Sequence, residues 1–207
     1  MNTPQNNDME NRIISAAKSV FIEKGFAETN MGDIAAKAGI NRPALHYYFR
    51  TKEKMFQAVF GEIISTIIPK VFGLLVQKDK PIDKRFEEIV NAYYCLFLEN
   101  PRLPMFVIRE MNRDISLLIR TATSMSMPQN LQSVINSLQE EMDEGKLKKV
   151  PLRFLFYNFY GLLTTPFLTL DITESLFLEK GETFKEMLEK WKPYIISQMK
   201  YLLAVET

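Results

Sequence analysis

The stretch MGDIAAKAGINRPALHYYFRTKEKM, residues 31–55, predicts two short helices joined by a sharp corner. Asn30 is placed to cap the first helix, and Asp33 puts an acid near the positive end of that helix in a capping-box-like arrangement. Gly39 supplies the left-handed residue that ends it. The first helix is therefore expected over residues 31–38.

A second short helix is expected over residues 42–49. Asn41 opens it, and Pro43 stands in its first turn, where the missing N–H costs nothing. Leu45 and Phe49 are four residues apart and are expected to face inward. The positions left to face outward are Asn41, Arg42, Pro43, Ala44, His46 and Tyr47.

The spacing of Ala35, Gly39 and Leu45 is typical of a DNA-binding helix-turn-helix, whose second helix enters the major groove. An ordinary tight helical corner also favours these small and apolar residues. The exposed composition favours DNA, because Arg42, His46 and the neighbouring tyrosines donate to phosphates or base edges.

The charge distribution supports the same interpretation. The whole chain has a net charge of +1, but residues 37–54 hold five basic residues and one acidic residue, a local +4 that leaves about −3 for the remainder. A short basic stretch on an otherwise balanced chain is what a compact DNA-reading element would show.

Cysteine and histidine content argues against metal and nucleophilic chemistry. The chain has one cysteine, Cys95, and one histidine, His46. A zinc site usually needs three or four ligands, and a catalytic triad would have to use His46 on a short surface helix. We therefore expect no enzyme activity, no metal and no cofactor, and a reducing cytoplasmic location.

The rest of the chain predicts an all-α protein with about nine helices and no internal repeat. Apolar residues recur at helical spacing in each segment. A polar loop is expected at residues 121–128. Pro69 is expected to kink its helix, and Pro193 is expected to kink or restart the last one. The expected helices cover residues 9–25, 31–38, 42–49, 52–72, 86–97, 104–119, 131–142, 152–170 and 184–202.

Residues 152–170, LRFLFYNFYGLLTTPFLTL, are the segment most like a membrane span. The segment contains Arg153, Asn158, Gly161 and Pro166, so a buried helix is the better interpretation. A helix that is apolar on nearly all faces must be buried on more than one side, either as the core of a monomer or partly across a two-fold axis. The N-terminal residues are polar and acidic, and no signal peptide is expected.

The segment around the helix-turn-helix resembles the N-terminal signature of the TetR family of transcriptional regulators. The resemblance covers about 45 residues and is carried by a Gly-aromatic step, a threonine, D-I-A-x-x-A-G-I, L-x-x-x-F and T-K-E. In this chain these are Gly25–Phe26, Thr29, Asp33-Ile34-Ala35, Ala38-Gly39-Ile40, Leu45 to Phe49, and Thr51-Lys52-Glu53.

The resemblance implies a DNA-binding domain at residues 1–51 and a helical ligand-sensing and dimerisation domain at residues 52–207. It implies phosphate contacts from Thr29, Asn30 and Lys52. The family's usual tyrosine after Leu45 is His46 here, and Tyr48 stands where histidine is common. The residues expected to bind double-stranded operator DNA are Thr29, Asn30, Asn41, Arg42, Pro43, Ala44, His46, Tyr47, Tyr48 and Lys52.

The resemblance also implies a homodimer built from the last two long helices, and a pocket for a small-molecule effector. Aromatic and methionine side chains suit a fairly apolar ligand, and Arg109 would admit an anionic one. Aromatics at helical spacing also suit a plain core. The candidate pocket residues are Tyr93, Phe97, Met105, Phe106, Arg109, Tyr157, Tyr160 and Phe167.

The expected function is a ligand-responsive regulator, a repressor in the commoner mode of the family, that a ligand releases from a palindromic operator. Activation stays open as the opposite sign of regulation. Two further classes stay open. One is a helical enzyme or small-molecule carrier, and the other is a helical module that binds protein with the same N-terminal head.

Overall fold

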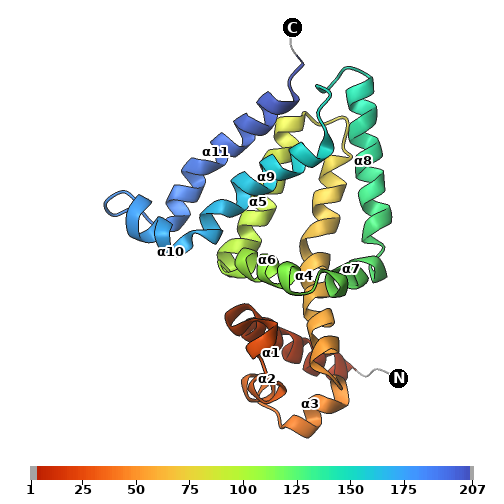
Figure 1. Cartoon of the computed structure of the whole chain (residues 1–207), viewed down its shortest axis with the longest axis vertical. Coiled ribbons are helices and arrows are strands. Elements are labelled where there is room, and N and C mark those ends of the chain that lie inside the picture. Colours follow the sequence, from red (N-terminus) through yellow and green to blue (C-terminus); the bar gives the residue numbers. More distant parts are fainter. Residues whose placement is uncertain (1–3, 206–207) are drawn as a thin grey trace. The chain divides into compact units, whose positions relative to one another are not determined.

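The computed structural model describes the backbone of residues 4–205 and the side chains of residues 8–205. Within this range every element is helical, with eleven α-helices and one π-helical turn (Figure 1). The all-α class predicted from the sequence is confirmed. The helices are α1 (Pro4–Glu28), α2 (Met31–Ala38), α3 (Arg42–Tyr48), α4 (Lys52–Leu75), α5 (Ile82–Glu99), α6 (Leu103–Arg113), α7 (Ile115–Ser124), α8 (Met127–Asp143), α9 (Leu152–Leu168), α10 (Leu170–Ile172) and α11 (Phe184–Leu203), with the π-helical turn at Thr173–Phe177.

The polar loop predicted at residues 121–128 is wrong. Thr121 lies inside α7, buried, and its hydroxyl donates to the Leu117 carbonyl at 3.0 Å, so the polar side chain is satisfied within the helix. Asp114 is the residue that starts α7, because its carboxylate accepts from the Leu117 N–H at 3.0 Å. The link to α8 is short and contains Ser126 at φ 56°. This split of one expected helix into α6 and α7, together with α10, accounts for the larger helix count.

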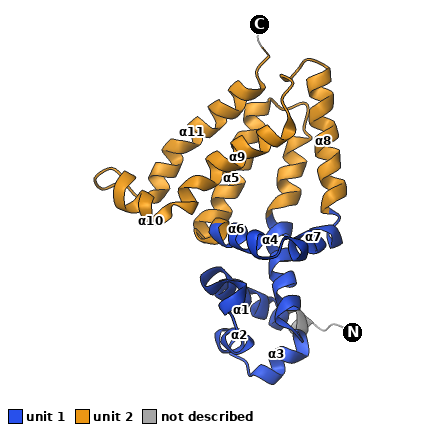
Figure 2. Ribbon diagram, in the orientation of Figure 1, with its two compact units in different colours: residues 1–66, 105–126 blue, residues 67–104, 127–207 orange. Residues whose placement is uncertain are grey.

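The chain forms two compact units, and each is assembled from separate stretches of sequence (Figure 2). Unit 1 holds the described residues up to Thr66 together with Met105–Ser126. Unit 2 holds Ile67–Pro104 and the described residues from Met127 onward. Helix α4 contributes to both units. The domain boundary expected after residue 51 stays a prediction.

The core of unit 1 is aromatic where α1, α4 and α6 meet. The Phe56 ring of α4 lies edge-on to Phe21 and Phe26 of α1, with centroids 5.4 and 5.2 Å apart. Phe106 of α6 packs on the same ring at 5.9 Å. Edge-to-face aromatic packing of this kind fixes the relative angles of the helices as well as burying apolar area. Helices α2, α3 and α7 also belong to the unit, with Ile34 of α2 and Leu45 of α3 fully buried.

The core of unit 2 forms where α5, α9 and α11 pack together. Phe167 of α9 is central, because its ring lies edge-on to Phe97 of α5 at 5.1 Å and to Phe184 of α11 at 5.4 Å. Trp191 of α11 donates its indole N–H to the Leu162 carbonyl of α9 at 3.0 Å. Helix α11 runs as one helix through Pro193.

Helix α9 is buried on one side only in the described chain. Leu155, Phe159 and Leu163 are buried, whereas Phe154 and Tyr157 are exposed. Of the two alternatives for this segment, a helix buried all round as the core of a monomer is therefore wrong, and burial across a two-fold axis stays a prediction. The exposed side carries large apolar groups, which require another partner if they are to be covered.

One helix in the described range, α4, has the length and hydropathy of a membrane span. The sequence pointed instead to residues 152–170, of which α9 covers 17 residues. Length and composition alone are weak evidence for a span, because the core helix of a soluble protein passes the same test. Met55, Phe56 and Val59 of α4 are fully buried in the core of unit 1.

Candidate nucleic-acid interface

Helix α3 is capped at its first turn and presents most of its side chains to solvent. The Asn41 carboxamide oxygen accepts from the Ala44 N–H at 2.8 Å, and Pro43 occupies the first turn. Leu45 is the one buried residue of the helix. The predicted capping and the inward position of Leu45 are confirmed. A short helix held by one buried leucine has the rest of its surface available to a partner.

The outward face of α3 carries the side chains that the sequence predicted. Arg42, Pro43 and His46 are exposed, and Tyr47 is 78% exposed. Tyr48 is half-buried, and its ring meets the Tyr47 ring edge-on at 5.3 Å. A guanidinium, an imidazole and a phenol on one short helix form a surface of hydrogen-bond donors suited to base edges and phosphates.

Helix α2 is held at both ends. The Asn30 side chain accepts from the Asp33 N–H at 2.9 Å, and Gly39 ends the helix in the left-handed region at φ 66°. Arg12 of α1 donates to the Ala38 carbonyl at 2.8 Å, which satisfies one of the last carbonyls of α2. The cap predicted at Asn30 and the stop predicted at Gly39 are confirmed.

The Asp33 carboxylate is fixed by α1. Lys24 donates to it at 2.8 Å, and this hydrogen bond is the main cause that lowers the pKa of Asp33. The same contact raises the pKa of Lys24. Both groups are therefore charged across the neutral range, and the pair anchors the start of α2 to the end of α1.

Two of the expected phosphate contacts have partners inside the protein. Thr29 is buried, and its hydroxyl donates to the Gly25 carbonyl at 2.7 Å. The Lys52 ammonium donates to the carbonyls of Phe26 and Thr29, each at 2.8 Å. These side chains brace the corner between α1 and α2, and their contact with phosphates stays a prediction.

Basic side chains lie on both sides of α3 along the chain. Lys37 lies at the end of α2, and Arg50 and Lys54 lie on either side of the start of α4. These three and Arg42 are exposed. The local positive charge found in the sequence is thus on the surface of unit 1, where it can attract phosphates.

Three charged residues of α6 also reach this corner, which no pattern in the sequence predicts. Glu110 is buried and accepts from the Phe26 N–H at 3.0 Å. Arg109 was a candidate for the effector pocket, but its guanidinium donates to the Phe21 carbonyl at 3.3 Å. Arg113 lies over the Phe26 ring, 4.0 Å from its centroid. No local sequence signal could find these contacts, because the partners are more than 80 residues apart.

The candidate pocket residues divide between the two units. Unit 1 holds Met105, Phe106 and Arg109, and unit 2 holds the other five. Met105 and Tyr157 are exposed. The pocket expected from these residues stays a prediction, because the three grooves described in the units are lined by other residues.

Two of the candidate residues form a buried polar contact. The hydroxyls of Tyr93 and Tyr160 lie 2.5 Å apart and share one hydrogen bond. Burial is the largest cause that raises the pKa of both phenols. These hydroxyls are neutral at physiological pH; one donates to the other, and the accepting hydroxyl keeps its own O–H for a further partner.

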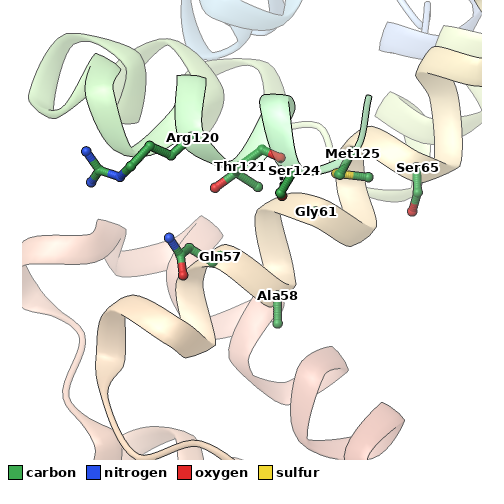
Figure 3. Close-up of a pocket in the computed structure, with 8 residues that line it drawn as sticks. All are labelled: Gln57, Ala58, Gly61, Ser65, Arg120, Thr121, Ser124 and Met125. Atoms are coloured by element: carbon green, nitrogen blue, oxygen red, sulfur yellow. Dashed lines mark hydrogen bonds between the residues drawn. The ribbon is translucent and has the colours of Figure 1, made fainter. Parts of the chain in front are cut away.

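The largest of the three grooves has a volume of about 410 Å³ and lies in unit 1 between α4 and α7 (Figure 3). Ala58 and Gly61 form its α4 side, and the Arg120 guanidinium extends along its α7 side. The Ser124 hydroxyl donates to the Thr121 carbonyl at 2.7 Å. Among the described residues no group of three histidine, cysteine or carboxylate side chains could hold a metal ion.

The N-terminal part of the chain, residues 13–59, matches the family model described as bacterial regulatory proteins, tetR family. The chain is 27% identical over 156 residues to the HTH-type transcriptional regulator SrpR of Pseudomonas putida, covering 74% of this chain and 70% of SrpR. Matches at 36% identity extend over only 55 residues and cover 26% of those relatives.

Solved structures share the fold over nearly the whole chain. A TetR family transcription regulator from Marinobacter aquaeolei superposes with a TM-score of 0.69 at 17% identity, covering 99% of this chain and 100% of that one. FadR from Bacillus subtilis, solved in complex with stearoyl-CoA, superposes with a TM-score of 0.64 at 18% identity, covering 90% of this chain and 97% of FadR.

Proposed function

The chain belongs to the TetR family of helix-turn-helix transcriptional regulators, and from this premise we propose that it is a ligand-responsive repressor that binds a palindromic operator as a homodimer. The observation that carries the proposal is the capped helix α3 with its exposed Arg42 and Tyr47. Its known relatives regulate transcription, so an enzyme is no longer a competing interpretation.

Arg42 and Tyr47 carry the sequence readout in this proposal. Arg42 lies in the first turn of α3 and can make a bidentate contact with guanine. Pro43 offers no hydrogen bond and can only pack against a base. Asn30, Thr29 and Lys52 would fix the register through phosphates, and His46 and Tyr48 would take the positions at the end of the helix.

The homodimer is supported by the exposed face of α9 and α11, which lie side by side in unit 2 (Figure 1). Tyr157 of α9 is 67% exposed, and Tyr194 and Tyr201 of α11 are exposed on the same pair of helices. A large aromatic face of this kind marks a protein interface. A two-fold dimer would set the two copies of α3 about 34–36 Å apart, or slightly more, to read a palindrome.

The effector in this proposal is small and fairly apolar. Helices α6 and α7 expose five apolar side chains, of which the two methionines are flexible: Met105, Ile108, Met111, Ile115 and Ile119. Methionine surfaces of this kind adapt to varied apolar ligands. The structure of FadR holds stearoyl-CoA, which combines an apolar acyl chain with an anionic head. A ligand of that general chemistry fits the proposal, in which the ligand releases a cytoplasmic repressor from its operator.

The test is selection of a duplex from a random DNA library with the full chain, followed by gel shift of the selected sequence. We expect a palindrome to be enriched. Arg42→Ala is expected to weaken its binding by ~10- to 100-fold, because a bidentate base contact discriminates by ~1–3 kcal/mol. Lys180→Ala, at an exposed position of unit 2, is the matched control and is expected to bind as wild type. Enrichment of no duplex would overturn the proposal.

A further inference from the structure

The corner that joins α1 to α2 is held by a carboxylate from α6. Glu110 has a 1% exposed side chain, and its Oε1 accepts the Phe26 N–H at 3.0 Å. This N–H belongs to the backbone immediately after Gly25, where α1 departs from helical geometry. A charged acceptor on a backbone N–H makes a stronger bond than a neutral one, so Phe26 is firmly fixed.

Two arginines of α6 complete this contact. Arg113 donates its Nε–H to Oε2 of Glu110 at 2.5 Å, and its guanidinium covers the Phe26 ring. Arg109 reaches past Gly25 to the Phe21 carbonyl. A Cβ at Gly25 would lie 2.7 Å from Cζ of Arg109, so the glycine makes room for the guanidinium. We call Glu110, Arg109 and Arg113 the α6 clamp.

The clamped corner leads directly into the proposed DNA contacts. Thr29 follows Phe26 by three residues, and Asn30 caps α2. Lys52 of α4 donates to the carbonyls of Phe26 and Thr29. The backbone from Phe26 to Asn30 is therefore fixed by α6 and α4 together. The positions of Thr29 and Asn30, the proposed phosphate contacts, depend on both helices.

We propose that Glu110 is a positioning residue for DNA binding: from outside the helix-turn-helix it sets the corner that carries Thr29 and Asn30, without touching DNA. The proposal rests on the proposed function for its DNA half. Under this proposal α6 contributes to DNA binding indirectly. The buried carboxylate of Glu110 accepts a backbone N–H, which an apolar residue at the same position could not do.

The test is Glu110→Gln in the full chain. The amide oxygen can still accept the Phe26 N–H, but the amide NH₂ then faces the Nε–H of Arg113, donor against donor. Hydrogen exchange is expected to rise at least tenfold in a peptide covering residues 22–31 and to stay within twofold elsewhere. Affinity for a duplex selected with the wild-type chain is expected to fall at least tenfold. Affinity for an unrelated duplex of equal length is expected to fall less than threefold.

The matched control is Glu62→Gln. Glu62 also joins another helix to α1, through Lys18 at 3.2 Å, but on the surface and away from the corner. It is expected to leave exchange and both DNA affinities within twofold of wild type. If Glu110→Gln does not fold, Arg113→Lys tests the same contact, because it keeps the charge but loses the planar Nε–H donor.

Two results would overturn the proposal. One is unchanged exchange at residues 22–31 together with unchanged operator affinity. The other is a rise in exchange across both units with an equal loss of affinity for both duplexes, which is the signature of general destabilisation. If the wild-type chain selects no duplex, the proposed function fails instead; exchange confined to residues 22–31 then supports the clamp, and unchanged exchange overturns it.

Discussion

The guanidinium of Arg85 and the carboxylate of Glu141 form a two-point ion pair in unit 2, with N–O distances of 2.7 and 2.6 Å. Both side chains are at most 3% exposed. Arg85 also donates to the carbonyls of Lys80 at 2.7 Å and Leu75 at 3.1 Å. The pair therefore joins α5 to α8 and to the end of α4. Most N–H groups of the guanidinium are hydrogen-bonded.

Glu141→Ala is expected to lower the free energy of unfolding by about 3–5 kcal/mol, because it leaves the Arg85 cation buried without its counter-charge. Urea denaturation of the full chain measures this loss. Glu87→Gln removes a half-exposed carboxylate that pairs with Lys84 at the surface and serves as the control, with an expected change within about 0.5 kcal/mol. A loss from Glu141→Ala as small as that of the control would contradict the prediction.

Gly25→Ala is expected to destabilise unit 1 by about 1–3 kcal/mol, because Gly25 adopts φ 79° and ψ 171°, a backbone region that is essentially restricted to glycine. The added Cβ must also displace the Arg109 guanidinium. Gly73→Ala is the control, since Gly73 lies inside α4 and its Cβ would meet nothing within 4 Å. It is expected to gain about 0.5–1 kcal/mol. Thermal unfolding that ranks the two variants in the reverse order would refute this account of Gly25.

Tyr157→Glu combined with Tyr201→Glu is expected to convert the proposed homodimer to a monomer, because two charges would enter the aromatic face of α9 and α11. Sedimentation velocity at micromolar concentration measures the change. Leu131→Glu places one charge at another exposed apolar position of unit 2 and is expected to leave the dimer intact. A wild-type chain that sediments as a monomer would reject the interface.

The stability of unit 2 is expected to fall at alkaline pH through its buried phenols. Burial raises the pKa of Tyr93 and Tyr160, so the fold favours their neutral forms. Their contribution is complete below the unfolded pKa of about 10 and is lost as the pH rises through the higher folded values. Tyr160→Phe is expected to flatten the fall of unfolding free energy between about pH 9 and pH 12. Equal slopes for variant and wild type would argue against this origin.

The sequence predicted the helix-turn-helix well because its signals are local. The cap at Asn30, the stop at Gly39 and the cap at Asn41 each act within a few residues, and all three are confirmed. The exposed face of α3 followed from helical periodicity once Leu45 was placed inward.

The sequence could not predict the contacts that depend on tertiary placement. Arg109 looked like an anion ligand in an aromatic segment, but the structure brings it to the Phe21 carbonyl. Thr121 and its neighbours looked like a loop because they are polar, but Thr121 to Ser124 lie in α7, where Thr121 is buried and its hydroxyl donates to the Leu117 carbonyl. The burial of Glu110 has no sequence signal, since its partner is a backbone N–H 84 residues away.

The divided construction of unit 1 has a consequence for the order in which the protein can form during synthesis. The helix-turn-helix is complete in sequence by residue 49, but Phe106 and Glu110 belong to the same compact unit and come much later. A nascent chain that ends before Phe106 and Glu110 lacks the acceptor of the Phe26 N–H. It also lacks the aromatic ring that packs on Phe56. The DNA-reading head therefore matures only after more than half of the chain has left the ribosome.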